Sequence, residues 1–455
     1  MKENPKLKEG SKIAIIGGGP AGSFFAHFAQ KWAAEKGINI SITIFDGKDF
    51  LQQGPRGCNL CAGVIAESLN EKLKEEGIFL PEERIINRVD GYCLHVDNKS
   101  LLLSCVENEK NTIATVFRGN GPRFSIFPEI ISFDDFLLSW VQDRGAEVIP
   151  QPVWEIKLPK NKKEPLRLHF GDRENIQKLD VDLAVGAFGV NTYLMKKIQE
   201  LGFGYAPPLT LITYQAEFKL DREKILEYFG NTIHVYMPKS KAIRYATVIP
   251  KGDYITITLI GHRNATKDFL KEFLNLEEIK KKIPLFKHQC FCYPRIVVSP
   301  SKKPFTDRLI MIGDASFSRH YKNGIESAFI TAQLAAESAF CTGIGASSFS
   351  HSYYKQAQKL ITKDNAYGRL LFSINDMISS IPLLTQSHLL LAKRMSNKGS
   401  SRKLRLILWN MFTGNIPYKD IFKSSLDIRL QISLLFNTIR LLFQKFKNAL
   451  SKDLI

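Results

Sequence analysis

Residues 12–46, KIAIIGGGPAGSFFAHFAQKWAAEKGINISITIFD, decide the fold of this chain. A short apolar run leads into a glycine-rich turn, a segment with helical periodicity that ends at Gly37, and a second apolar run that ends at Asp46. This order predicts a buried strand, a helix and a second strand parallel to the first. Such a βαβ unit indicates an α/β protein built on a parallel sheet.

The turn between the first strand and the helix has the sequence Gly17-Gly18-Gly19-Pro20-Ala21-Gly22. Gly17 permits a tight exit from the strand, Gly19 lets the backbone approach a pyrophosphate, and Gly22 lets the helix pack closely on the strand. The helix N-terminus then faces the phosphates. Asp46 ends the second strand where an acidic side chain is expected to receive a ribose hydroxyl. We therefore predict a dinucleotide site that includes Pro20 and Ala21.

A second motif distinguishes FAD from NAD. Gly313 and Asp314 follow a predicted buried strand, roughly 290 residues after the first motif, and Gly324 and Ile325 begin a long helix of small and apolar residues. A carboxylate at this position can accept hydrogen bonds from a ribityl hydroxyl. The helix N-terminus favours the negative charge that a flavin ring gains on reduction. FAD is therefore the predicted cofactor.

Composition and length restrict the class of protein. The chain has 455 residues, of which 44% are hydrophobic and 24% charged, as expected for two packed globular domains with an appendage. Its charged start does not resemble a secretory signal, and no apolar run reaches the roughly 18–20 residues that cross a bilayer. Seven cysteines fit free thiols in a reducing compartment. We expect a cytoplasmic protein.

Basic residues concentrate near the C-terminus. From Lys393 onward there are thirteen Lys and Arg against three Asp and Glu, so this part carries +10 of the net charge of +18. Zinc-finger and RNP-type motifs are absent from the sequence, so nucleic acid is not an expected partner. A basic segment that is also rich in Leu, Ile and Phe favours an anionic membrane as the partner.

One helix in this region is predicted to be strongly amphipathic. Within residues 426–447, one helical face carries Ile428, Ile432, Leu435, Ile439, Leu442 and Phe446. The opposite face carries Ser433, Asn437, Arg440, Gln444 and Lys447. The apolar face either packs on the body of the protein or lies in the interface of an anionic membrane. The second alternative makes the protein peripheral on the inner face of the membrane.

The cofactor motifs are interleaved with strand-rich segments. We therefore predict an α/β fold with a Rossmann-like FAD-binding domain, an inserted β-sheet substrate domain and a helical C-terminal appendage. The FAD-binding domain is expected to comprise residues 1–90, 128–190 and 296–345. The substrate domain is expected to comprise residues 91–127 and 191–295, and the helical basic region residues 346–455.

Four motifs together resemble a known family. GGGPAG, the loop GCNLCAG (57–63), YATVIPKGD (245–253) and GDAS…YKNGIESAF (313–329) are similar in order and spacing to the geranylgeranyl reductase family of flavoproteins. That family belongs to the larger group built like p-hydroxybenzoate hydroxylase. The resemblance implies an FAD domain, a β-sheet substrate domain over the flavin, and hydride delivery from reduced flavin to an isoprenoid C=C bond.

Residue by residue, the resemblance implies both matches and departures. Cys61 and Gly63 match a Cys-Gly-Gly near the flavin, and Tyr245 begins a matching pocket motif, so Cys61 and Tyr245 are the implied catalytic residues. Thr247 and Ile249 replace the Trp and Phe of that motif, which implies a smaller and more polar lining. Phe188-Gly189 replaces an Asp-Gly pair, and Ile131-Ser132 stands where an Arg usually precedes the FDxxL helix.

The glycine-rich loop allows further interpretations. Cys58 and Cys61 form a CxxC motif. One alternative is that this motif binds zinc together with His288, Cys290 and Cys292, and another is that it acts as a redox dithiol. The spacing favours structural thiols plus one cysteine at the substrate pocket, without a metal. Arg56 in the same loop is a candidate phosphate ligand.

These features predict an FAD-dependent oxidoreductase that saturates a double bond in an isoprenoid or other hydrophobic substrate. The expected electron donor is NAD(P)H or a ferredoxin-like acidic protein that meets the basic surface. One alternative is a flavin monooxygenase that hydroxylates an aromatic or lipid compound. An alternative of another class is an FAD-binding module without catalytic activity.

Overall fold

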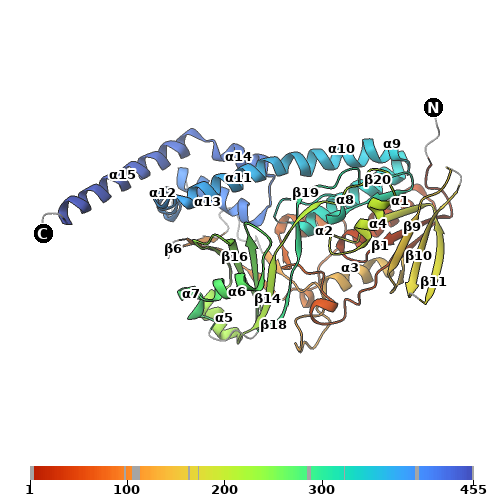
Figure 1. Ribbon diagram of the computed structural model, residues 1–455, viewed down its shortest axis with the longest axis horizontal. Helices are drawn as coiled ribbons and strands as arrows, with labels where there is room; N and C mark the ends of the chain where they lie inside the picture. The colour runs from red at the N-terminus through yellow and green to blue at the C-terminus, as the bar shows by residue number, and fades with distance from the viewer. Residues whose placement is uncertain are drawn as a thin grey trace.

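The computed structural model describes residues 5–96, 99–104, 113–161, 164–172, 174–283, 288–321, 323–394 and 399–452. Part of residues 91–127, which are expected to belong to the substrate domain, lies outside these ranges. In Figure 1, one end of the molecule holds the N-terminal α/β layers, a second sheet lies beside them, and helices run along one side to the C-terminus.

The predicted βαβ unit forms the centre of a six-stranded sheet with the strand order β20-β21-β12-β1-β2-β8. Strand β1 (Ser11–Ile16) pairs in parallel with β2 (Ile40–Phe45) and with β12 (Leu183–Gly186). The outer strands are β8 (Glu147–Ile149), β21 (Leu309–Met311) and the antiparallel β20 (Phe305–Thr306). The parallel sheet is therefore assembled from three separate parts of the chain.

Three helices cover this sheet. They are α1 (Pro20–Lys36), α3 (Phe133–Gln142) and α8 (Gly324–Glu337). Helix α1 ends where the sequence predicts, because Gly37 adopts the left-handed conformation with φ of 62°. Ser132 caps α3 by accepting a hydrogen bond from the Asp135 amide. Phe24, Phe28 and Phe329 join α1 to α8 through edge-to-face contacts in the largest hydrophobic core.

A seven-stranded sheet has the order β18-β14-β17-β16-β15-β5-β6. Its strands are β5 (Gly91–Val96), β6 (Lys99–Ser104), β14 (Tyr214–Lys219), β15 (Thr232–Met237), β16 (Ile243–Lys251), β17 (Tyr254–Gly261) and β18 (His288–Cys292). Strands β16 and β17 form an antiparallel hairpin, in which Lys251 pairs with Tyr254. Strand β15 pairs in parallel with β5, which joins two distant segments of the chain.

Smaller strands form two three-stranded sheets and one two-stranded sheet. The additional strands are β3 (Val64–Ile65), β4 (Asn87–Val89), β7 (Ile113–Thr115), β9 (Val153–Lys157), β10 (Leu166–Asp172), β11 (Asn175–Val181), β13 (Leu209–Ile212) and β19 (Arg295–Ser299). Short helices are α2 (Glu67–Glu75), α4 (Leu194–Glu200), α5 (Arg222–Phe229), α6 (Lys267–Leu274) and α7 (Glu277–Lys280). Helices α5 to α7 pack against the seven-stranded sheet (Figure 1).

Beyond residue 346 the described residues form helices joined by short connections, as predicted. The main helices are α11 (Lys363–Ser380), α12 (Pro382–Lys393), α13 (Gly399–Thr413), α14 (Tyr418–Ser425) and α15 (Ile428–Lys452). Helices α12, α13 and the first part of α15 pack on strands β5 and β6 in one hydrophobic core. The rest of α15 extends away from the body (Figure 1). Among the described residues, helices long and apolar enough to span a bilayer are absent.

Helix α15 presents its apolar face to solvent, so of the two alternatives for that face the structure does not show packing on the protein body. The exposed fractions are 74% for Ile428, 47% for Ile432, 60% for Leu435, 39% for Ile439, 41% for Leu442 and 68% for Phe446. The opposite side of the helix holds it in place. Leu430 and Leu434 are buried there, and Asn437, predicted to be on the polar face, accepts a hydrogen bond of 2.9 Å from Arg394.

Candidate functional site

One large cavity of about 1220 Å³ lies between the two sheets and the C-terminal helices. Its polar part contains the glycine turn after β1, the end of β2 and the start of α8. Its apolar part is lined by strands of the seven-stranded sheet and by helices α11 to α15, including Leu94, Val96, Ile233, Leu404, Leu430 and Leu434. Because both parts belong to one cavity, a cofactor in the first part and an apolar substrate in the second would lie side by side.

The glycine turn leaves no space for side chains. Gly17 has φ of 110°, and a Cβ there would lie 2.5 Å from the Ala187 carbonyl oxygen. A Cβ on Gly19 would lie 2.9 Å from Asn59 Nδ2, and one on Gly22 would lie 1.9 Å from the Gly17 carbonyl oxygen. Gly17, Gly19, Pro20 and Ala21 line the cavity, whereas Gly22 supports the turn from behind. The backbone at the start of α1 is thus open to a phosphate group.

Asp46 lies at the cavity wall at the end of β2, as predicted. Its carboxylate accepts hydrogen bonds from the amides of Gly18 at 2.7 Å and Lys48 at 2.8 Å. Burial raises its pKa, whereas these two amides oppose that effect. The amides hold the carboxylate in a fixed orientation beside the glycine turn, which suits a ribose hydroxyl.

The second predicted motif closes the opposite end of the polar part. Gly313 has φ of 59° and lies against Ala21, since a Cβ would be 2.8 Å from the Ala21 methyl carbon. Asp314, Gly324 and Ile325 line the cavity. A Cβ on Gly324 would lie 3.8 Å from Asp314 Oδ1, so the carboxylate faces the N-terminus of α8. The structure therefore brings the two sequence motifs together around one cavity.

The surroundings of Asp314 indicate whether the polar part of the cavity fits FAD. Its Oδ1 atom is buried and has no hydrogen-bond partner within the described protein. Burial raises the pKa of Asp314 above its ordinary value. An unpartnered buried carboxyl oxygen is costly, and a ribityl hydroxyl donated by a flavin would satisfy it. The glycine turn and this orphaned oxygen together fit the two ends of FAD.

A buried ion pair that sequence reasoning missed supports the polar part. Arg118 donates through Nε and through Nη2, the latter at 2.9 Å, to the carboxylate of Asp134 in the first turn of α3. Asn59 Nδ2 donates to the same carboxylate at 2.5 Å. Arg118 lines the cavity and is only 7% exposed. It is a buried cation next to the α3 helix, where the arginine expected at residues 131–132 is absent.

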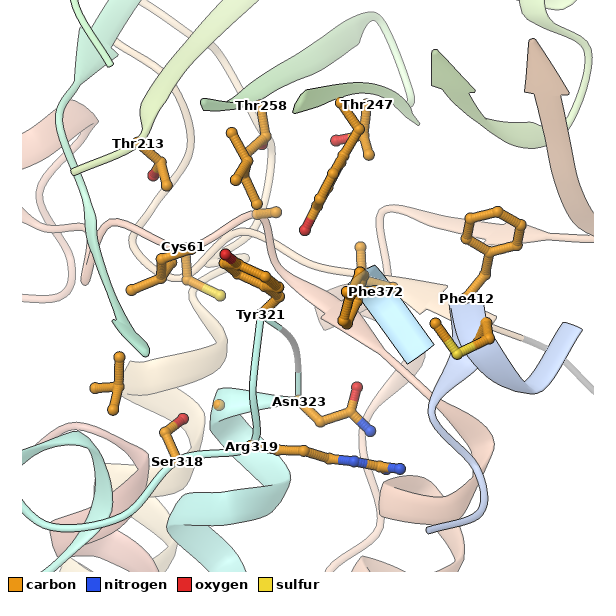
Figure 2. Close-up of a pocket in the computed structure, with 18 of the residues that line it drawn as sticks. Cys61, Thr213, Thr247, Thr258, Ser318, Arg319, Tyr321, Asn323, Phe372 and Phe412 are labelled. Carbon is orange, nitrogen blue, oxygen red and sulfur yellow. The ribbon is translucent and has the colours of Figure 1, made fainter. Parts of the chain in front are cut away.

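The two predicted catalytic residues both line the cavity. Figure 2 shows Cys61 with its sulfur directed towards Tyr321, which stands near the centre of the pocket. Tyr245 lies near Tyr321, with ring centroids 6.4 Å apart, and burial raises the pKa of its phenol far above the ordinary value. Gly63 does not line the cavity but has φ of 66° and approaches the Val116 carbonyl, which fixes the loop that carries Cys61.

Tyr321 and Arg244 are site residues that sequence reasoning did not identify. Arg244 donates a hydrogen bond of 2.7 Å from Nη1 to the Tyr321 hydroxyl and pairs with Asp376 of α11. Tyr321 has φ of 65°, an uncommon conformation for a residue other than glycine. Its position in the motif YKNGIESAF was visible in the sequence, but its contact with Phe372 of α11, 51 residues further along, was not.

Two interpretations of the glycine-rich loop are not supported. Arg56 is exposed and does not line the cavity, whereas Lys48 does, so Lys48 is the better phosphate candidate. Cys58, Cys290 and Cys292 approach one another around a small cavity of about 30 Å³, but Cys61 lies in the large one. Within the described residues, the side chains that lie close enough together to hold a metal ion do not include these cysteines. All described cysteines are free of disulfide bonds.

The fold and the site define an FAD-dependent oxidoreductase. No protein-family model matches the chain. The resemblance to geranylgeranyl reductases is confirmed by known relatives. The chain is 24% identical over 345 residues to the geranylgeranyl diphosphate reductase of Synechocystis, with 73% of this chain and 75% of that protein covered. It is 23% identical to the chloroplastic enzyme of Arabidopsis thaliana, of which 62% is covered.

Solved structures confirm the predicted fold class. A geranylgeranyl bacteriochlorophyll reductase-like protein from Thermoplasma acidophilum superimposes with a TM-score of 0.56 at 16% identity, covering 95% of this chain and 96% of that one. A variant of the halogenase PltM in complex with FAD gives a TM-score of 0.60 at 12% identity, covering 93% and 88%. These similarities concern the fold.

Proposed function

We propose that this protein reduces C=C bonds of an isoprenoid or other hydrophobic substrate, with FAD bound in the polar part of the cavity. The observation that carries the proposal is the single cavity that joins the FAD cradle to a long apolar compartment. An apolar compartment of this kind favours a lipid chain over a small polar compound. The relatives named geranylgeranyl diphosphate reductase support the same substrate class. The two sheets would be the FAD-binding and substrate domains at the boundaries expected from the sequence.

The protein must supply a proton as well as hold its ligands. When bound and reduced, FAD supplies the hydride for one carbon of the double bond. The other carbon needs a proton from a side chain of the cavity. Tyr245 is the first candidate, because its phenol lines the cavity beside Tyr321 and carries a proton at neutral pH. Cys61 is the alternative, since its thiol lines the same cavity.

The test is an anaerobic turnover experiment. The FAD-loaded protein is reduced with dithionite and incubated with geranylgeranyl diphosphate, and separately with a mixed prenyl-lipid extract. Mass spectrometry should show products that gain two hydrogen atoms per saturated bond. Absence of saturated products from both substrates would contradict the proposal. A hydroxylated product formed only with NADPH and oxygen would favour the monooxygenase instead.

The electron donor is proposed to be NAD(P)H or an acidic ferredoxin-like protein. The net charge of +18 makes attraction to an acidic protein favourable at ordinary ionic strength. Stopped-flow measurements of flavin reduction with each donor would distinguish them. Reduction by ferredoxin that slows steeply with added salt would identify the protein donor.

Helix α15 is proposed to bind an anionic membrane surface. Its exposed face includes Phe436 at 68% and Phe443 at 71%, in addition to the six predicted apolar residues. Exposed basic residues flank this face, namely Arg429, Arg440, Lys445 and Lys447. The described helix contains no acidic residue. Leu426 and Leu435 are 60% exposed and also line the large cavity, so a lipid on this surface would be near its entrance.

We expect the triple substitution Phe436→Ser, Phe443→Ser and Phe446→Ser to reduce binding to phosphatidylglycerol vesicles at least about tenfold, because each phenyl group loses its burial in the interface. Vesicle co-sedimentation measures the effect. A matched control is Phe124→Ser, which removes another phenyl group that is 85% exposed. Equal binding to phosphatidylcholine and phosphatidylglycerol, or unchanged binding of the triple variant, would contradict the membrane proposal.

A further inference from the structure

A compact group of side chains lies outside the cavity, on the opposite face of the seven-stranded sheet. Leu94, Val96, Ile233 and Val235 of strands β5 and β15 line the cavity. The alternate residues of the same strands point to the other face, where α5 to α7 pack. In the parallel ladder, Cys93 is the register partner of His234, and His95 is the partner of Tyr236. Cys93, His95 and His234 therefore meet on one face.

The three side chains have the donor types and spacing of a metal site. Cys93 Sγ and one ring nitrogen from each histidine all lie within 4.8 Å of one another. His234 is buried, and Cys93 and His95 are half-buried. One thiolate and two imidazoles are ligands that zinc prefers, and zinc commonly takes a fourth ligand from water or a carboxylate.

The outer nitrogen of each imidazole faces an acceptor. His234 Nε2 lies 2.7 Å from the Phe229 carbonyl oxygen and must donate to it, because a carbonyl only accepts. His95 Nδ1 lies 3.7 Å from Glu278 Oε2, at ion-pair distance from a carboxylate. The Phe229 carbonyl therefore fixes the His234 proton on Nε2, whereas Glu278 lies beyond hydrogen-bond distance of His95. This arrangement resembles the outer contacts that orient histidine ligands of metals.

The inner nitrogens of the same two rings then converge. His95 Nε2 and His234 Nδ1 are 2.8 Å apart, so in the metal-free protein His95 Nε2 donates a hydrogen bond to the lone pair on His234 Nδ1. When the His95 proton is instead on Nδ1, on the side of Glu278, both inner nitrogens have lone pairs for a metal ion. Together with the Cys93 sulfur they form a set of three ligands.

We propose that Cys93, His95 and His234 bind one zinc ion, with Glu278 in contact with the outer side of His95. Binding displaces the Cys93 thiol proton to solvent, since the thiolate is the ligand. The two inner nitrogens must separate by roughly half an ångström, because Zn–N bonds of about 2.0–2.1 Å in a tetrahedron hold them further apart. The ion joins strands β5 and β15, whose ligands are 139 residues apart, behind the wall of the apolar compartment.

The test measures metal on the FAD-loaded full chain and is independent of turnover. The protein is incubated with excess zinc, passed through a desalting column and analysed by elemental mass spectrometry. We expect one zinc per chain. X-ray absorption at the zinc edge should show one sulfur at about 2.3 Å and two nitrogens at about 2.0–2.1 Å. Zinc should also raise the melting temperature, because the site exists only in the folded state.

Matched variants make the result specific. Cys93→Ser, His95→Gln and His234→Gln should each lower zinc affinity at least tenfold. Cys341→Ser and His351→Gln change an exposed cysteine and an exposed histidine, and they should leave it unchanged. Flavin content and the melting temperature in the absence of zinc verify that each variant folds. Less than a tenth of an equivalent in the wild type, or full zinc retention in the three ligand variants, would overturn the proposal.

Discussion

Substitution of Asp314 by Asn is expected to lower the affinity for FAD by about 10- to 100-fold while raising the thermal stability of the FAD-free protein. The substitution removes a charge-assisted hydrogen bond between the carboxylate and the ribityl chain. Such a bond contributes about 1.5–3 kcal/mol to the binding free energy. In the FAD-free protein Asp314 is half-buried, and its Oδ1 atom is buried and unpartnered. Removing its charge therefore stabilises that state. Fluorescence titration with FAD and thermal melting measure the two effects.

The opposite signs make this result diagnostic. Asp420→Asn, which neutralises an exposed aspartate of α14, should change neither quantity. The FAD affinity of the wild type should also fall as the pH is lowered, because the pKa of Asp314 is raised and protonation removes the acceptor charge. If Asp314→Asn binds FAD as tightly as the wild type, Asp314 does not contact the cofactor and the assignment of the second motif is wrong.

Substitution of Tyr245 by Phe is expected to lower the rate of C=C reduction about 100-fold, which is typical of the loss of a general acid. FAD affinity and flavin reduction should be unchanged, because the phenol hydroxyl is removed without a change in the shape of the ring. Single-turnover product formation by the dithionite-reduced enzyme measures the rate. The wild-type rate should stay constant from neutral pH to above pH 10, since burial raises the pKa of Tyr245.

Two further variants complete the experiment. Tyr228→Phe alters a tyrosine that packs beside the sheet and does not line the cavity, and it should retain the wild-type rate. Cys61→Ala tests the other candidate donor. A full rate in Tyr245→Phe together with a large loss in Cys61→Ala would transfer the role to the thiol.

The sequence located the turns and strand ends at the cofactor end of the cavity, because these depend on local backbone geometry. A turn that must approach a pyrophosphate needs glycine at Gly17, Gly19 and Gly22, and the contacts of these residues show why. The strand-turn-helix order around Gly313 and Gly324 is equally local. By contrast, Arg118 could not be identified, because its partner Asp134 becomes a neighbour only when α3 docks on the sheet.

The C-terminal helix shows the same division. Periodicity alone predicted an amphipathic α15, but it left open whether the apolar face contacts the protein body or a membrane. The structure places Leu430 and Leu434 against the body and leaves Phe443 and Phe446 in solvent. Which side of a helix is buried depends on the neighbouring helices and on where the preceding segment ends, and neither is encoded in the helix itself.

The sequence by itself determined that this chain has a βαβ unit, an FAD-type pair of motifs and a basic helical end. Each of these depends on residues close together in the chain, whose spacing constrains backbone geometry directly. Only the tertiary structure decided that Tyr245 and Cys61 share one cavity, that Arg244 reaches Tyr321, and that Cys93 meets His234. Those contacts depend on the register of strands and the docking of helices, which long-range packing sets.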